Sequence, residues 1–503
     1  MKKPHHNVIR TVGRVLSVWC IVILCAMPST LQAAPPVRDQ LTVMSRNLYL
    51  GADVYAAAQF LPDLQAASQY LWENMQQTSF VARADAFADE VMRTRPDVIG
   101  LQEAATWYCR DAYASSARIV YDYTQLLIDA LDRRGVAYMV ARAPAALPSQ
   151  HTGFSIPTVP YITTVRDPVL FPALFGSDTA SCGFAVADVL LVHATRAGDV
   201  YRSGASDFVF DYTLVPGLVD MNRGYAWLDM HVGAQTVRVV STHVEAFFYD
   251  NLQPYSIRQT KQLIHDLEST TSALIVLGDF NNDPHDPIPR GQLNTGARLT
   301  ASAACPAQPV LLTSATADDT CNTYWMMRHA AYVDVGPESM FGANATWGYS
   351  ADLAGPAIDR LLESEFHQTA LGLTARLDYI FVRNGATVVT ADIIGNEWPH
   401  HGWPCARHSQ QQNAKGTALL LGLPYTDAHG CAPSDHAGVV ATIRIHDSPS
   451  QITVPPFRVA HIYAYLVGFL GSVGLLWWAV RRRRQQRRLR PWRRQPHQVH
   501  NPA

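Results

Sequence analysis

The sequence predicts an α/β protein with large sheets, which lies between two flanking segments that engage a membrane. Three observations lead to this prediction. Short β-like runs alternate with helical patterns in the middle of the chain, each end carries an apolar run, and basic residues are concentrated at both ends. The composition, with 48% hydrophobic and 16% charged residues among 503, excludes a disordered, collagen-like or coiled-coil chain.

Residues 1–34 are predicted to be a secretory signal peptide. A basic start is followed by the apolar run Val15–Met27, and then by Pro28 and small residues up to Ala34. This apolar run is too short for a typical membrane-spanning helix. The alternative interpretation is an uncleaved signal anchor.

Residues 35–445 are predicted to form a single folded domain. Two stretches resemble insertions, residues 143–182, which are rich in Pro, and residues 290–323, which are rich in Ala and Thr. Two helical patterns cover Phe80–Arg93 and Ser256–Ser269. The β-like runs are bounded by turn residues, and they are Leu41–Met44, Val98–Leu101, Val189–Val192, Tyr225–His231, Val237–Ser241, Leu274–Leu277, Leu377–Val382 and Val439–Ile445.

The C-terminal part predicts a stem, residues 446–458, a transmembrane helix, residues 459–480, and a basic tail, residues 481–503. The helix segment Val459–Val480 contains no Lys, Arg, Asp or Glu and is long enough to cross roughly 30 Å of hydrocarbon. Four consecutive arginines, residues 481–484, follow it, so the positive-inside rule places the tail in the cytoplasm and the body outside. The alternatives are a buried core helix and a nucleic-acid-binding tail.

The charge distribution agrees with this topology. Residues 1–34 and 459–503 together hold 13 of the 40 Lys and Arg residues and none of the 42 Asp and Glu residues. The body between them therefore has 27 basic and 42 acidic residues, a balance of −15. An acidic body argues against a groove that attracts polyphosphate.

The cysteines indicate an oxidising compartment. Six remain after removal of the signal, namely Cys109, Cys182, Cys305, Cys321, Cys405 and Cys431. An even number in an exported chain favours disulfides, and we expect neighbours to pair, above all Cys305 with Cys321 and Cys405 with Cys431. Fifteen pairings are formally possible, and free buried cysteines are the alternative. The chain has no CxxC pair, which argues against a structural zinc site.

Polar residues gather where the β-like runs begin or end. Runs ending at Asn47, Glu103 and His243 present an amide, a carboxylate and an imidazole. Taken alone, each such residue more often belongs to a turn or to a solvated loop than to a functional site. Together they predict a site at one rim of the sheets, suited to a hard cation and to acid–base chemistry. The remaining members are Asp279 and Asn281 after one run, Asp378 at the start of another, and Asp435 and His436 before the last.

The order of these motifs, Asn … Gln-Glu … Thr-His … Gly-Asp-Phe-Asn … Asp-Tyr-Ile … Ser-Asp-His, resembles the endonuclease/exonuclease/phosphatase superfamily. The resemblance runs from about Leu41 to Ile445 and implies a four-layer α/β/β/α sandwich for the catalytic domain. It implies that Glu103 is the main Mg²⁺ ligand, with Asn47 beside it and Asp435 supporting the metal. Mn²⁺ is the expected substitute.

The same resemblance implies the catalytic roles. His243, Asp279 and Asn281 would contact the scissile phosphate and its metal. Asp378 would orient His436, the general base that activates water. Thr346-Trp347 resembles a Thr-aromatic element of the family, with a packed aromatic residue as the equally good alternative.

The substrate is less well defined than the reaction. The stretch from Thr242 to Ala246, with Ser256–Gln259 after it, is most similar to the bacterial sphingomyelinase branch, although Asp279-Phe280 stands where those enzymes more often have Asp-Met. We therefore expect a membrane-anchored, extracytoplasmic phosphodiesterase that prefers a lipid headgroup. A nuclease is the first alternative, and an inactive surface-binding module is the second.

Overall fold

The computed structural model describes residues 39–111, 113–141, 155–156, 163–215, 219–246, 254–284, 322–336, 344–357, 372–405 and 407–446. The predicted signal peptide, transmembrane helix, basic tail and nearly all of the stem lie outside these residues, as does most of the predicted insertion at 290–323. Within the described ranges, the search found no helix that is both long enough and apolar enough to cross a membrane.

Within the described residues, the strands form two mixed sheets, one of 11 strands and one of 6. The larger sheet has the order β16 (Ala386–Ile394), β17 (Gly438–Ile445), β1 (Gln40–Asn47), β2 (Val98–Arg110), β7 (Thr179–His193), β5 (Ser155–Ile156), β10 (Val219–Met221) and β9 (Tyr212–Val215), with β3 (Arg118–Asp122), β4 (Tyr138–Val140) and β6 (Thr164–Arg166) attached. The smaller sheet has the order β14 (Val333–Asp334), β15 (Asp378–Arg383), β13 (Ala273–Asp279), β12 (Gln235–His243), β11 (Gly224–Val232) and β8 (Val200–Asp207).

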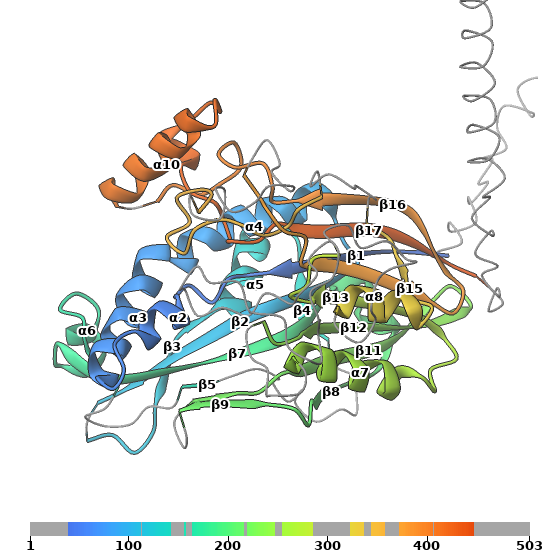
Figure 1. Ribbon diagram of the computed structural model, residues 1–503, viewed down its shortest axis with the longest axis horizontal. Helices are drawn as coiled ribbons and strands as arrows, with labels where there is room; N and C mark the ends of the chain where they lie inside the picture. The colour runs from blue at the N-terminus through green and yellow to red at the C-terminus, as the bar shows by residue number, and fades with distance from the viewer. Residues whose placement is uncertain are drawn as a thin grey trace, which may run out of the picture.

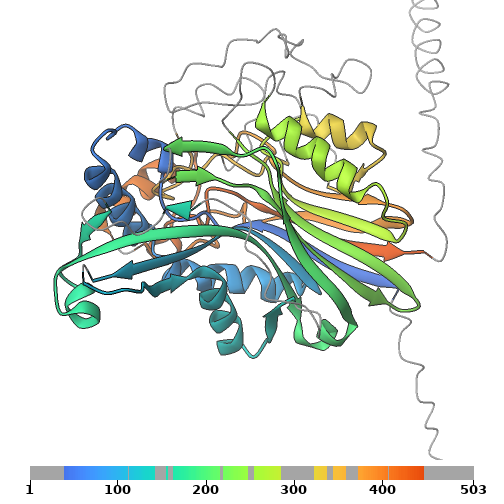
Figure 2. The same ribbon diagram turned by 90° about the horizontal axis from the view of Figure 1, so that it is seen from below.

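The two sheets pack face to face, and helices cover the outer face of each (Figure 2). Val43 and Leu190 of the larger sheet share one buried cluster with Leu228 and Ile275 of the smaller sheet. The larger sheet is covered by α3 (Leu64–Thr78), α4 (Phe80–Thr94) and α5 (Tyr123–Arg133), and the smaller sheet by α7 (Tyr255–Leu267) and α8 (Thr323–His329). The predicted α/β fold is confirmed, and its layers run helix, sheet, sheet, helix.

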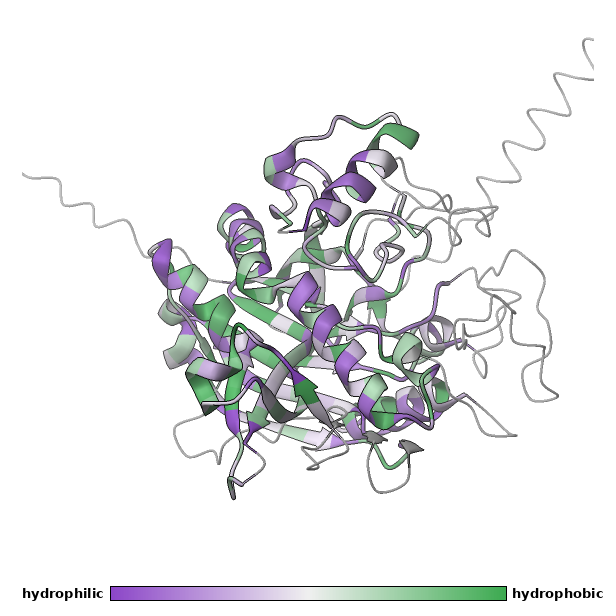
Figure 3. Cartoon of the chain, turned by 90° about the vertical axis from the view of Figure 1, so that its left-hand side faces the viewer, coloured by the Kyte–Doolittle hydropathy of each residue, from purple (hydrophilic) through white to green (hydrophobic). Residues whose placement is uncertain are grey.

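Hydrophobic residues are concentrated on the strands in the interior, and hydrophilic residues on the outer faces of the helices (Figure 3). At one point the sheets approach very closely, because a Cβ on Gly100 would lie 1.8 Å from Cδ1 of Leu277. The apolar runs that predicted the strands are therefore the surfaces that the two sheets bury against each other and against the helices.

The strand pairing brings distant polar residues to one rim. β1 runs parallel to β2 and pairs Asn47 with Gln102, the residue before Glu103. β12 runs parallel to β13 and pairs His243 with Asp279, and β13 in turn pairs Asp279 with Asp378 of β15. Because parallel strands end at the same edge of a sheet, these residues lie at one rim of the two sheets. Figure 1 labels the strands of both sheets and shows β12 beside β13.

Two disulfides lie in the described residues. Cys109 of β2 pairs with Cys182 of β7, its direct cross-strand neighbour. The predicted pairing of Cys405 with Cys431 is also present. The predicted Cys305–Cys321 pairing lies outside the described residues.

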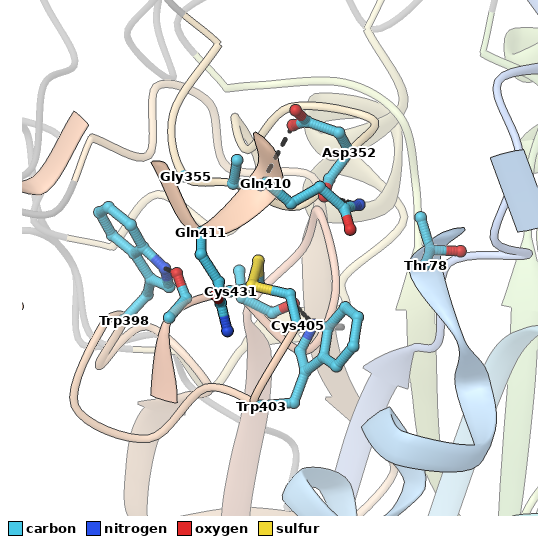
Figure 4. Close-up of a disulfide and its surroundings, with 12 residues drawn as sticks. Thr78, Asp352, Gly355, Trp398, Trp403, Cys405, Gln410, Gln411 and Cys431 are labelled. Carbon is cyan, nitrogen blue, oxygen red and sulfur yellow. Dashed lines mark hydrogen bonds between the residues drawn. A yellow bond between two sulfur atoms is a disulfide. The ribbon is translucent and has the colours of Figure 1, made fainter. Parts of the chain in front are cut away.

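A long connection between β16 and β17 carries α10 (His408–Leu420) and packs around Cys405–Cys431, with the rings of Trp398 and Trp403 nearby (Figure 4). The indole nitrogen of Trp403 donates to the carbonyl of Ala432 at 2.9 Å, one residue after Cys431. Trp403 and the disulfide therefore fix the segment that leads into Asp435 and His436. The other short elements are α2 (Val54–Ala58), α6 (Phe171–Phe175) and the 3₁₀ turns at Ala194–Asp199 and Asp427–His429.

Part of the predicted insertion at residues 143–182 belongs to the larger sheet. Its described portion includes β5 and β6, and its last residues begin β7. Both short strands pair with β7, so this portion extends the larger sheet.

Candidate active site

All eight predicted site residues meet at the rim where β1, β12 and β13 end. Five of them are buried, and Glu103, Asn281 and Asp435 are partly exposed. These three therefore border the opening to solvent. The buried five are Asn47, His243, Asp279, Asp378 and His436.

Asn47 lies between Glu103 of the larger sheet and Asp279 of the smaller sheet. Its Nδ2 is 3.3 Å from Oε1 of Glu103 and 3.1 Å from Oδ2 of Asp279, and its Oδ1 accepts from the backbone N–H of Tyr49 at 2.8 Å. Glu103 sits where the pairing of β2 with β7 is interrupted, with a positive φ of 53°. This irregularity turns its carboxylate toward Asn47, and the N–H of Leu50 donates to it at 2.8 Å.

His436 and Asp378 form a buried pair. Nδ1 of His436 is 2.9 Å from Oδ2 of Asp378, so it donates its proton to that carboxylate. Nε2 of His436 faces Oδ2 of Asp279 at 3.6 Å and Oδ1 of Asp435 at 4.0 Å. Burial alone would lower the pKa of His436, but the charges of Asp378, Asp435 and Asp279 outweigh burial and raise this pKa to about 10.

Two of the carboxylates are also strongly perturbed. Burial, together with the charge of Asp378, raises the pKa of Asp279 to about 7. Removal from water and the charge of Asp435 raise the pKa of Glu103. In both groups burial is the larger cause and a neighbouring carboxylate adds to it.

The same groups fit a cation. Ligand atoms of Asp279, Asp378 and His436 all lie within 4.8 Å of one another. Oδ1 of Asp378 is buried and has no hydrogen-bond partner within the described part of the chain. Two carboxylates with one unsatisfied buried oxygen are donors that a hard divalent cation accepts, and Glu103 with Asn47 and Asp435 offers a second set of oxygen donors at the opening of the same site.

The Nδ1 atom of His243 faces a guanidinium, whereas that of His436 faces a carboxylate. Its Nδ1 is 3.0 Å from Nη1 of Arg223, and its Nε2 is 3.0 Å from Nδ2 of Asn281 and 3.5 Å from Oδ2 of Asp279. Burial, then the charge of Arg223, and then that of His436 hold the pKa of His243 well below its usual range. His243 is therefore neutral at physiological pH.

Thr346 supports the site from beside β15. Its Oγ1 accepts from the backbone N–H groups of Leu377 at 3.0 Å and of Asp378 at 3.1 Å. The ring of Trp347 lies 6.4 Å from that of His436, centre to centre. Thr346 therefore orients Asp378, and Trp347 packs beside the imidazole of His436.

Sequence reasoning missed two buried arginines that hold the site loops. Arg83 of α4 donates to the carbonyls of Leu48 at 2.6 Å, Tyr49 at 3.0 Å and Pro433 at 2.9 Å. Arg46 donates to the carbonyl of His436 and pairs with Glu90 of α4 at 2.9 Å. No sequence signal marks them, because most of their partners are backbone carbonyls distant in the chain.

Sequence reasoning also missed Arg223, which links His243 to Glu245. The only available signal was its position directly before the Gly224 that opens β11. In the sequence this is indistinguishable from an ordinary arginine in a turn.

Residues 72–436 match the model of the Endonuclease/Exonuclease/phosphatase family. The chain belongs to this family. Members of the Endonuclease/Exonuclease/phosphatase family are metal-dependent phosphoesterases and nucleases, and this chain combines their fold with a possible metal site. The prediction that the chain is a metal-dependent phosphoric ester hydrolase is therefore confirmed as an enzyme class. A search of curated protein sequences found no significant match.

Solved structures with a similar arrangement include other members of the Endonuclease/Exonuclease/phosphatase family. The protein from Beutenbergia cavernae is 15% identical with a TM-score of 0.39, covering 82% of this chain and 73% of its own. The protein from Bacteroides thetaiotaomicron is 12% identical with a TM-score of 0.39, covering 81% and 98%. A humanized TDP2 from D. rerio is 13% identical with a TM-score of 0.36, covering 80% and 99%.

Proposed function

We propose that the chain hydrolyses a phosphodiester with the help of a divalent cation, Mg²⁺ by preference and Mn²⁺ as a substitute. The observation that carries this proposal is the convergence of four acidic residues and two histidines at one rim. The surroundings raise the pKa of one histidine, His436, and lower that of the other, His243. Glu103, Asn47 and Asp435 would hold the cation, since two of them border the opening and Asn47 contacts Glu103. When bound, the cation neutralises phosphate oxygens and stabilises charge on the leaving oxygen.

His436 is the general base in this proposal. With a pKa of about 10 it is protonated at neutral pH when the carboxylates around it are not neutralised. A divalent cation held by Asp435 and Glu103 would remove the contribution of Asp435 to this pKa, and so would shift it toward the range in which imidazole accepts a proton from water. Asp378 keeps the other nitrogen protonated, so Nε2 is the nitrogen that receives the proton.

His243, Asp279 and Asn281 contact the phosphate in this proposal. Oδ2 of Asp279 lies 3.5 Å from Nε2 of His243 and 3.6 Å from Nε2 of His436. A phosphoryl group beside Asp279 would therefore meet both imidazoles. The backbone N–H of Asn281 fixes the other oxygen of Asp279 at 2.9 Å, which keeps Oδ2 turned toward the site.

Substitution of Glu103 tests the metal assignment. Glu103→Ala should remove most hydrolysis of a generic phosphodiester, and a chelator should do the same reversibly. Glu397→Ala is the matched control, because Glu397 is an exposed acid that pairs with Arg93 at 3.6 Å and with His401 at 3.2 Å. Activity that survives both Glu103→Ala and the chelator would exclude the proposed metal role.

For the substrate we propose a phospholipid or sphingomyelin headgroup, supported by the motif resemblance and by the acidic body. Nucleic acid is the alternative, since the family also contains nucleases. The complete set of motif residues argues against an inactive binding module. The test compares sphingomyelin, phosphatidylcholine, inositol phosphates and plasmid DNA with the full-length chain and Mg²⁺. Rapid DNA cleavage without release of phosphocholine would make nucleic acid the first candidate substrate and the lipid headgroup the second.

We further propose that the enzyme is anchored in the cell membrane with the catalytic domain outside the cytoplasm. The domain's two ends lie together, because the N–H of Ile445 donates to the carbonyl of Asp39 at 2.8 Å. β17 begins two residues after His436 and runs for 8 residues, so these ends lie about 25 Å from the site. A membrane attached at either end would face away from the opening, unless the domain lies on its side.

A further inference from the structure

Three fully buried polar side chains form a layer directly beneath the site. They are Ser45 of β1, Gln102 of β2 and Ser241 of β12, and each stands one or two residues before a site residue of its own strand. Two positions before the serines, on the same faces of their strands, Val43 and Val239 belong to the apolar cluster between the sheets. The polar layer therefore lies between the rim and the apolar core.

The amide of Gln102 joins the two sheets within this layer. Its Nε2 donates to Oγ of Ser241 on the smaller sheet at 3.0 Å, and its Oε1 accepts from Oγ of Ser45 on the larger sheet at 3.4 Å. The hydroxyl of Ser241 in turn lies 3.5 Å from the carbonyl of Leu101. Because a hydroxyl can both donate and accept, this bridge forms whichever way the carboxamide is turned.

A glycine lets the sheets approach closely enough for the bridge to form. Gly100 lies two residues before Gln102, and a Cβ at this position would lie 1.8 Å from Cδ1 of Leu277 and 3.0 Å from Oγ of Ser241. The side chain of Leu277 therefore limits how close the sheets come, whereas the hydrogen bonds of Gln102 oppose their separation. Buried polar groups whose hydrogen bonds are satisfied fix one arrangement more strictly than apolar contacts do.

The proposed functional groups are divided between the same two sheets. Glu103 and Asn47, which are proposed to hold the cation, belong to the larger sheet. His243 and Asp279, which are proposed to contact the phosphate, belong to the smaller sheet. At the rim itself the sheets are joined by groups that the cation and the phosphate would engage, such as Asn47 with Asp279 at 3.1 Å. The bridge of Gln102 uses none of these groups.

We propose that Gln102 is a positioning residue, whose amide holds the cation-binding half of the site at a fixed distance from the phosphate-binding half. The inference rests on the proposed phosphodiesterase function for the roles of the two halves. Gln102 is fully buried, so it acts through the strands that it joins. A displacement of about 1 Å between reacting groups can lower a rate by about 100-fold, so a bridge beneath the site has a large effect on turnover.

Substitution of Gln102 separates turnover from cation binding. Gln102→Met removes the bridge and nearly keeps the length of the side chain. It should lower kcat by about 10- to 100-fold but change the Mg²⁺ affinity, measured by calorimetry, by less than about twofold, because the proposed ligands lie on one sheet and move together. Thr42→Val is the matched control, since the hydroxyl of Thr42 contacts that of Thr442 at 3.1 Å within the larger sheet. This control should retain the full kcat.

An apolar layer distinguishes positioning from a contribution to folding. Gln102→Met alone leaves two serine hydroxyls without their amide partner, so it should lower the urea concentration at the midpoint of unfolding. The triple substitution Ser45→Ala, Gln102→Met and Ser241→Ala removes those unpaired hydroxyls and should restore most of that midpoint. We expect kcat to stay low in the triple variant, because the amide that sets the distance is still missing.

Crystal structures of the unsubstituted chain and of Gln102→Met measure the displacement without reference to activity. The Cα atoms of Gln102 and Ser241 should move by about 0.5–1 Å relative to each other, which exceeds the tolerance of a catalytic site. Unchanged positions of these atoms would overturn the proposal.

The kinetic results can overturn the proposal in three further ways. These are full kcat in Gln102→Met, recovery of kcat together with stability in the triple variant, and a loss of Mg²⁺ affinity as large as the loss of kcat. An unsubstituted chain that hydrolyses no phosphodiester would instead refute the proposed function, and a displacement in Gln102→Met would then still support the bridge between the sheets.

Discussion

Binding of a divalent cation should release protons from the site, and its affinity should therefore rise with pH. The charges of Asp378, Asp435 and Asp279 raise the pKa of His436 to about 10, and burial with the charge of Asp378 raises that of Asp279 to about 7. A cation held by Asp435 and its neighbours would offset part of this negative charge. At pH 7.5, His436 is almost fully protonated and Asp279 is mostly ionised. Cation binding at this pH should release about one proton, mainly from His436.

The magnitude follows from this proton count. Release of one proton makes the dissociation constant about tenfold smaller for each pH unit, which corresponds to about 1.4 kcal/mol. Between pH 7.0 and 8.5 the affinity for Mg²⁺ or Mn²⁺ should therefore rise about 30-fold. Isothermal titration calorimetry in buffers of different ionisation enthalpy measures both the affinity and the number of protons released.

His436→Asn is the variant that isolates the main contributor. It should reduce the number of protons released by about one, because His436 is the main source and Asp279 is already mostly ionised at pH 7.5. An affinity that is the same at pH 7.0 and 8.5 would refute the reasoning. So would a His436→Asn protein that releases as many protons as the unsubstituted chain.

Four further outcomes are expected. Asp378→Asn should lower kcat by at least about 100-fold, measured with Mg²⁺ at saturation, because it replaces the charged acceptor of the His436 Nδ1 proton with a neutral carboxamide that also carries a donor; unchanged kcat would contradict the pairing. Leu277→Ala, which opens a cavity between the sheets, should lower the free energy of unfolding in urea by about 2–5 kcal/mol, and a loss below 1 kcal/mol would mean that the sheets close over the gap. Alkylation of denatured, unreduced protein should label neither Cys405 nor Cys431, whereas labelling of both would exclude the disulfide. Protease added outside intact cells should degrade the catalytic domain and spare a C-terminal tag, and a protected domain would reverse the proposed topology.

The cores of the strands could be predicted from the sequence, but their lengths could not. Val98–Leu101 is a continuous apolar run and lies within β2, which extends to Arg110. The pattern stops at Gln102 and Glu103 because the strand bulges there, and polar residues at a bulge look like the end of a strand. The sequence therefore reveals where a strand is buried on both faces, but not how far the hydrogen bonding continues.

The connection carrying α10 escaped prediction for a related reason. The residues that α10 buries are Gln410, Ala414 and Ala418, at spacings of four. Helical spacing is present, but small and polar side chains give almost no contrast between the two faces of the helix. The packing of this helix depends on Trp398, Trp403 and the Cys405–Cys431 disulfide, which come from elsewhere in the connection.

The site residues were recognisable because each lies at the beginning or end of an apolar run, and parallel pairing then brings those ends together. Their assigned roles came from the family resemblance. Arg83, Arg46 and Arg223 were not recognisable, because a buried arginine is defined by its partners. Those partners are carbonyl, carboxylate or imidazole groups at other places in the chain, and a single arginine in a sequence gives no sign of them.

These buried charges explain how a site rich in carboxylates keeps its shape before a cation binds. α4 was predicted as a helix over Phe80–Arg93, and Arg83 and Glu90, two turns apart, both lie on its buried face. Arg83 holds the loops on either side of the site by their carbonyls, and Glu90 orients Arg46 toward the carbonyl of His436. Taking such charges out of water is costly, and hydrogen bonds to carbonyls offset only part of that cost. In return, the backbone that carries Asn47, Asp435 and His436 is fixed by the fold, so the cation and substrate need not organise it when they bind.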